Sequence, residues 1–112
     1  MSTSFSPPSG TTYRTDEVAE FFRRMGVPAP VFEHKFHPIR DWRFDLCWPS
    51  QKIALEVHGG LFSGGRHNTA LGFLKDMEKE NAAALLGWRI LKTTPRYLIS
   101  FGTAAMIKEI LQ

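Results

Sequence analysis

Residues 43–58, with the sequence RFDLCWPSQKIALEVH, have the pattern of two β-strands joined by a short turn. Apolar residues alternate with polar or small ones over residues 40–48 and again over residues 52–58, which is typical of strands. The turn Trp48-Pro-Ser-Gln-Lys52 is short enough to make these strands antiparallel neighbours. We expect one face of the first strand to hold Trp42, Phe44, Leu46 and Trp48, and the other face to hold Arg43, Asp45 and Cys47.

Segments on both sides of this hairpin extend the predicted element order to α-β-β-β-α-β-α. Thr15 starts a stretch in which Val18, Phe22 and Met25 recur at helical spacing, and Gly26 ends that helix. The other expected elements are a strand over 31–36, a helix over about 69–86, a strand over 88–92, a short helical turn at Thr94-Pro95 and a helix from Thr103. The sequence therefore predicts an α/β fold with a mixed four-stranded sheet flanked by helices.

The length and composition of the chain fit one globular domain. The 112 residues, 43% of them apolar, are enough for one compact core, so we expect a single domain over residues 13–112 after a flexible tail over residues 1–12. Cys47 is the single cysteine, which excludes an internal disulfide. We find no secretory signal and no apolar run near the roughly 18 residues of a membrane span, so we expect a cytoplasmic protein without a membrane partner. The net charge of +3 allows a polyanionic partner but does not require one.

Two acidic residues and a histidine are predicted to cluster beside the hairpin. Asp45 and Glu56 lie at similar distances from the turn, so their carboxylates can stand close together across the two strands. His58, two residues after Glu56, points to the same face. Two neighbouring carboxylates repel each other unless a proton or a cation lies between them, and Mg²⁺ prefers oxygen ligands. The alternative is an exposed strand face, on which these acids pair with Arg43 or Lys52.

A third carboxylate is expected near this pair. Glu33 lies on the preceding strand and is the preferred candidate. Glu17 flanks the apolar stripe of the first helix and is the alternative, whereas Glu20 lies opposite that stripe and should face water.

The residues between the third strand and the second helix carry further candidate contacts. The glycine-rich loop over residues 59–65 can fold over a phosphate, and Arg66 can clamp that phosphate. His67 is a candidate second acid or base, and Asn68 can cap the helix that follows. An ordinary polar helix entry is the alternative interpretation of this segment.

The helix expected over residues 69–86 has one polar residue on its apolar stripe. Leu74, Met77 and Leu85 define the stripe, and Asn81 falls on it. We therefore expect the Asn81 side chain to face inward and to form a hydrogen bond there.

The spacing Asp45-x10-Glu56-x-His58, within a helix–three strands–helix–strand order, resembles the PD-(D/E)XK nuclease superfamily. More narrowly, the segments over residues 43–48, 53–60 and 81–91 are similar to small phage and bacterial endonucleases, including the very-short-patch repair endonucleases. The resemblance implies a restriction-endonuclease-like αβββαβ core. It also implies a metal site for Mg²⁺, or Mn²⁺ in its place, at Asp45, Glu56, the Val57 carbonyl and Glu33.

The sequence departs from the superfamily pattern at one catalytic position. His58 stands where the superfamily usually has lysine, so either this imidazole or a displaced lysine would complete the site. Lys75 and Lys79, on the second helix, are the candidates for a displaced lysine. Histidine occurs in this region of the mismatch-repair enzymes that the chain resembles.

The resemblance implies a metal-dependent endonuclease that hydrolyses DNA phosphodiester bonds. Asp45, Glu56, His58 and His67 would be the catalytic residues. The candidate DNA contacts are Arg40, Arg43, Arg66, Asn68 and Lys75. A monomer would nick DNA, and a homodimer could cut both strands. The alternative is a non-catalytic module of the same fold that binds nucleic acid or protein.

Overall fold

The computed structural model describes residues 13–59 and 70–112, so the expected tail, the glycine-rich loop beyond Gly59, Arg66, His67 and Asn68 lie outside the described residues. The elements are α1 (Thr15–Arg24), β1 (Val31–Lys35), β2 (Arg43–Trp48), β3 (Ile53–Val57), α2 (Ala70–Leu85), β4 (Arg89–Thr93), α3 (Pro95–Leu98) and α4 (Phe101–Leu111). Their order is the predicted α-β-β-β-α-β-α, with the short helical turn expected at Thr94-Pro95 present as the additional helix α3.

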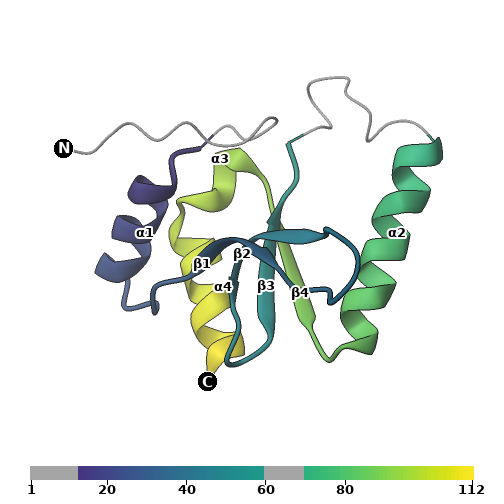
Figure 1. The fold of residues 1–112 in the computed structure, drawn as a ribbon. Helices are drawn as coiled ribbons and strands as arrows, with labels where there is room; N and C mark the ends of the chain where they lie inside the picture. The colour runs from purple at the N-terminus through teal and green to yellow at the C-terminus, as the bar shows by residue number, and fades with distance from the viewer. Residues whose placement is uncertain (1–12, 60–69) are drawn as a thin grey trace.

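The strands form one mixed sheet in the order β1-β2-β3-β4. β1 pairs with β2 and β2 with β3 in antiparallel fashion, whereas β3 and β4 are parallel and connected through α2. α2 lies on the opposite side of the sheet from α1, α3 and α4 (Figure 1). The structure therefore confirms an α/β fold with a mixed four-stranded sheet flanked by helices.

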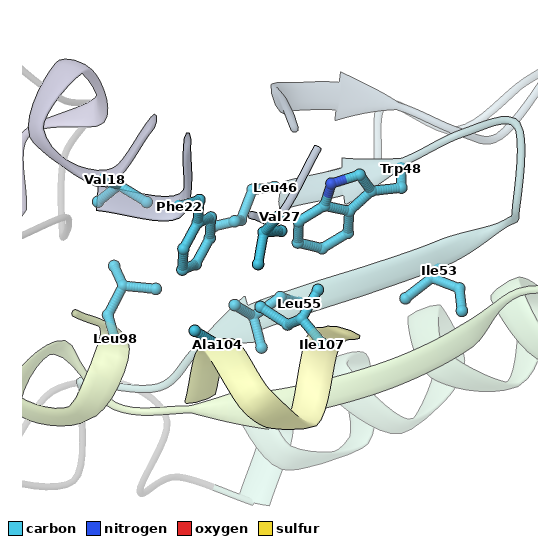
Figure 2. Close-up of a cluster of buried hydrophobic side chains, with 10 residues drawn as sticks. All are labelled: Val18, Phe22, Val27, Leu46, Trp48, Ile53, Leu55, Leu98, Ala104 and Ile107. Carbon is cyan, nitrogen blue, oxygen red and sulfur yellow. The ribbon is translucent and has the colours of Figure 1, made fainter. Parts of the chain in front are cut away.

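The larger core fills the space between the sheet and three helices. Figure 2 shows side chains of α1, α3 and α4 meeting those of β2 and β3. Its buried members are Val18, Phe22, Val27, Leu46, Trp48, Ile53, Leu55, Leu98, Ala104 and Ile107. The apolar stripe predicted for α1 is part of this core, and Gly26 ends α1 with a φ of +79°, a conformation that glycine adopts without strain.

A smaller core lies on the α2 side of the sheet. Phe44, Cys47, Ala54, Ala83 and Trp88 are its buried members. Ala83 is the single buried residue of α2, so this helix contributes little apolar surface to the fold. Most of its attachment comes instead from polar side chains, as described below.

The prediction that Phe44, Leu46 and Trp48 share one face of β2 is wrong for Phe44. Leu46 belongs to the larger core, whereas Phe44 stacks on Phe36 in the smaller one, with ring centroids 4.1 Å apart. The neighbouring strand changes face at the same level, because Glu33 has a φ of +54°, which breaks the regular pleat. Asp45 therefore lies at the position where the side chains of β2 change from one face of the sheet to the other.

Two helix starts also differ from the prediction. α4 begins at Phe101 rather than Thr103, because the Ser100 hydroxyl accepts a hydrogen bond from the Thr103 N–H at 3.1 Å and caps the helix there. At α1 the N-cap is Arg14, and no side chain caps the helix. Thr94 caps α3 as expected, accepting from the Tyr97 N–H at 3.4 Å.

The orientation expected for α2 is wrong. Leu74, Met77, Asn81 and Leu85 are exposed, so their stripe faces away from the sheet rather than into the core. Among residues 13–59 and 70–112, no helix is long and apolar enough to cross a membrane.

Candidate active site

Asp45 and Glu56 lie side by side at the point where β2 and β3 separate. The regular pairing of these strands ends at Leu46 and Leu55. Beyond it, the Val57 N–H donates to Asp45 Oδ2 at 2.7 Å, and the Asp45 N–H donates to Glu56 Oε2 at 3.0 Å. Each carboxylate thus accepts a hydrogen bond from the backbone of the other strand, where the sheet would otherwise use a carbonyl. This reciprocal pairing fixes both acids and confirms that the turn brings them together.

Lys79 reaches this pair from α2. Its Nζ atom lies 3.1 Å from Glu56 Oε1 and donates to the Arg43 carbonyl oxygen at 2.6 Å. The side chains of Lys79 and Glu56 are only 21% and 16% exposed, so this ion pair is largely shielded from water. Lys75, one turn earlier on the same helix, is exposed. Of the two candidates for a displaced lysine, the structure therefore brings Lys79 to the acidic pair.

The surroundings of the Glu56 carboxyl group disfavour its ionised form. Burial, and after it the negative charge of the neighbouring Asp45, raise its pKa from the usual 4.5 to about 7. The Lys79 ammonium and the Asp45 N–H oppose this shift because both stabilise the ionised form. Two carboxylates thus lie side by side in a largely buried place, where a divalent cation with oxygen ligands would stabilise their charged forms.

Glu33 is close enough to this pair to share its electrostatic environment. Burial raises the pKa of its carboxyl group, and Asp45 adds to the rise. Arg43 and Lys79 act in the opposite direction. Within the described residues, however, no three His, Cys, Asp or Glu side chains meet as a metal-binding group. The role of Glu33 as a third ligand stays a prediction.

His58 follows the last residue of β3. Its backbone N–H donates to the Thr93 carbonyl oxygen at 2.8 Å, which ties the residue to the end of β4. Its Nε2 atom is buried and has no hydrogen-bond partner in the described part of the chain. A buried ring nitrogen that forms no hydrogen bond destabilises the folded protein, and a ligand or water can remove this cost by forming the hydrogen bond. The Nε2 atom of His58 is therefore suited to interact with a bound molecule.

Tyr13 is a neighbour of the site, although no motif or spacing in the sequence marks it. Burial raises the pKa of its hydroxyl group, and the charges of Asp45, Glu33 and Glu56 raise it further. The tyrosine lies immediately before α1, far in sequence from all three acids. Only the packing of α1 on the sheet brings it near them.

Of the cationic residues expected to bind DNA, those in the described part of the chain lie at the surface. Arg40 pairs with Glu78 at 3.0 Å and stacks 4.0 Å from the centre of the Trp42 ring. Arg43 pairs with Asp41 at 3.1 Å, and the ion-pair partner of Glu56 is Lys79 rather than Arg43 or Lys52. Lys75 is exposed on α2.

The acidic residues of α1 do not contribute to the site. Glu20 forms ion pairs with Arg23 and Arg24 at 2.8 and 3.0 Å, and these arginines hold the pKa of its carboxyl at about 2. Glu17 is exposed and lies 3.8 Å from Arg14. Glu20 thus faces water as predicted, and Glu17 is engaged at the surface.

Comparisons with known proteins give no relative from which a function can be transferred. The chain matches no protein-family model, and neither curated proteins nor solved structures give a match. The functional interpretation therefore depends on the geometry of the site and on the resemblance of its motif.

Proposed function

We propose that this protein is a Mg²⁺-dependent endonuclease with a restriction-endonuclease-like core that hydrolyses DNA phosphodiester bonds. The observation that carries the proposal is the contact of Asp45, Glu56 and Lys79 at the point where β2 and β3 separate. Two acids on adjacent strands, joined by one lysine, are the residue types that the resemblance assigns to metal binding and charge stabilisation.

The acidic pair fits a hard divalent cation. Asp45 and Glu56 present carboxylate oxygens from adjacent strands, and burial together with the charge of Asp45 raises the pKa of Glu56. Asp45 and Glu56 would hold Mg²⁺ or Mn²⁺, with the Val57 carbonyl and Glu33 as further oxygen ligands. Bound there, the ion would lower the pKa of a coordinated water and neutralise charge on the phosphate.

The remaining residues have roles that follow from their charge and position. Lys79 would move its ammonium from Glu56 to the scissile phosphate, where it would stabilise the charge that develops in the transition state. His58, with its buried Nε2 atom, would orient or deprotonate the attacking water. His67 remains the candidate for protonating the leaving group. Arg40, Arg43, Lys75, Arg66 and Asn68 are the proposed contacts to the DNA backbone.

A cleavage assay on supercoiled plasmid and on branched and mismatched duplexes tests this proposal. We expect products with Mg²⁺ or Mn²⁺ and none with EDTA. Glu56→Gln should reduce cleavage to background, and Lys79→Ala should reduce it by about 100-fold, the usual effect of losing one group that stabilises transition-state charge. Glu109→Gln is the matched control, because Glu109 is exposed on α4, across the sheet from α2. Undiminished cleavage by a folded Glu56→Gln variant would contradict the proposal.

A second candidate function is a non-catalytic module that binds nucleic acid or protein. One observation favours it: Lys79 already forms an ion pair with Glu56, so part of the acidic charge is balanced without a metal. Such a module would retain DNA in a gel-shift assay in EDTA, with strong salt dependence, and would yield no product with any metal.

A further inference from the structure

The loop between β1 and β2, residues 36–42, carries planar side chains that stack from the smaller core out to the surface. Phe44 is fully buried, and the Phe36 ring lies nearly parallel to it, with centroids 4.1 Å apart. The Trp42 ring is inclined by only 17° to Phe36, at 6.3 Å. The Arg40 guanidinium lies 4.0 Å from the centre of the Trp42 ring, and the Arg40 side chain is 48% exposed. We call Arg40 and Trp42 the stacking platform.

Contacts within the loop hold the stacking platform in place. The Phe36 N–H donates to the Trp42 carbonyl oxygen at 3.2 Å and so joins the two ends of the loop. Between them, His37 Nδ1 accepts hydrogen bonds from the N–H groups of Ile39 and Arg40 at 3.1 and 2.9 Å. The His37 ring also stands edge-on to Trp42, with centroids 5.1 Å apart. A ligand would therefore find the guanidinium already in position, which reduces the entropy lost on binding.

The stacking platform lies beside the acidic pair of the candidate active site. Glu78 of α2 accepts a hydrogen bond from Arg40 Nη1 at 3.0 Å, and Lys79, the next residue, bonds to the acidic pair. Asp45 follows Trp42 by three residues, so their Cα atoms are no more than about 11 Å apart. One strand of duplex DNA advances about 3.4 Å per nucleotide. A phosphate at the acidic pair would therefore bring a nucleotide only a few positions away to the platform.

We propose that the stacking platform binds an unpaired nucleobase, so that the preferred substrate is DNA with a single-stranded segment next to the bond that is cut. A guanidinium face stacks on a base of any sequence, and an aromatic ring beside the guanidinium adds a cation–π contact. In an intact duplex the neighbouring bases cover these faces. One N–H of Arg40 goes to Glu78, and the others remain available to a phosphate. The inference rests on the DNA binding of the proposed function and adds a preference between forms of DNA.

Fluorescence anisotropy in EDTA, with a blunt duplex and the same duplex carrying a short single-stranded thymine extension, tests the inference. We expect the wild type to bind the extended duplex about tenfold more tightly, the usual contribution of stacking one base. Arg40→Lys keeps the positive charge but lacks the planar group, so it should bind the two duplexes with nearly equal affinity. Arg96→Lys is the matched control, because Arg96 lies 5.7 Å from the centre of the Tyr97 ring but on α3, across the sheet from α2. This variant should keep the preference.

Two variants of Trp42 separate stacking from a merely structural role. Trp42→Phe keeps an aromatic ring beside the guanidinium and should retain most of the preference, whereas Trp42→Leu removes the ring and should abolish it. Equal affinity of the wild type for both duplexes, or an unchanged preference in Arg40→Lys, would overturn the inference and leave the proposed function intact. Absence of binding to either duplex would contradict the proposed function itself. A preference for the extended duplex without any metal-dependent cleavage would support the inference and contradict only the proposed catalysis.

Discussion

Replacing Lys79 by methionine should destabilise the metal-free protein at pH 8 much more than at pH 5. Methionine keeps most of the aliphatic stem and removes the ammonium group that pairs with Glu56. At pH 8 the variant holds two neighbouring carboxylates without the Lys79 ammonium group beside them. At pH 5 Glu56 is largely protonated in the folded protein, because its pKa is raised to about 7, and little charge remains to be balanced.

The sign and size of this effect follow from the pKa of Glu56. A carboxyl whose pKa is higher in the folded than in the unfolded state contributes stability below pH 4.5, and that contribution is lost as pH rises through about 7. The rise from 4.5 to about 7 corresponds to about 3 kcal/mol lost by pH 8. Loss of Lys79 raises the pKa of Glu56 further, so we expect an additional loss of about 2 kcal/mol at pH 8, the usual effect of leaving a buried charge unpaired. For a domain of this size, that lowers the melting temperature by roughly 10 °C.

Thermal unfolding followed by circular dichroism, with EDTA at both pH values, measures the effect. Lys92→Met is the matched control, because Lys92 also pairs with a glutamate of α2 but does so at an exposed position, where an ion pair contributes less than about 1 kcal/mol. Adding Mg²⁺ at pH 8 should restore much of the stability that Lys79→Met loses. An equal loss at pH 5 and pH 8 would refute the electrostatic reasoning and assign the effect to the hydrogen bond with Arg43 O. Absence of any Mg²⁺ effect would show that the acidic pair does not bind the ion.

Two further predictions concern the core and the surface. Leu55→Ala should lower the free energy of unfolding, measured in urea, by about 3 kcal/mol, because Leu55 is fully buried in the larger core. Ile39→Ala, at an 82% exposed site, should change this free energy little. Equal effects of the two substitutions would contradict the assignment of Leu55 to the core. Arg40→Ala should reduce the salt slope of DNA binding by about one, as expected for the loss of one phosphate contact, while Arg23→Ala on α1 should leave the slope unchanged. Filter binding at several salt concentrations measures this slope, and an unaltered slope for Arg40→Ala would exclude a phosphate contact.

The proximity of Asp45 and Glu56 could be predicted from the sequence because it depends on a short turn and on strand alternation, which are local features. A short turn sets the register of β2 and β3, and register alone brings Asp45 opposite Glu56. The same local rules failed for Phe44. At that position the two carboxylates accept hydrogen bonds that backbone carbonyls would accept in a regular sheet, and the side chains of β2 change from one face of the sheet to the other. The alternation of apolar residues in the sequence does not predict this change of face. Glu33, with its positive φ, belongs to the same interruption of the pleat.

The choice between Lys75 and Lys79 shows a different limit. Both lie on α2, one helical turn apart, and helical periodicity treats them almost alike. What separates them is how far along the sheet the helix is placed, which depends on the contacts of Ala83 and of Lys79 itself. Periodicity likewise located the apolar stripe of α2 correctly but could not say what covers it, since a stripe is equally apolar in a core and in an interface.

These two results for α2 are physically connected. A helix that delivers a lysine to a buried acidic pair must turn a polar side toward the sheet, and its apolar side then faces outward.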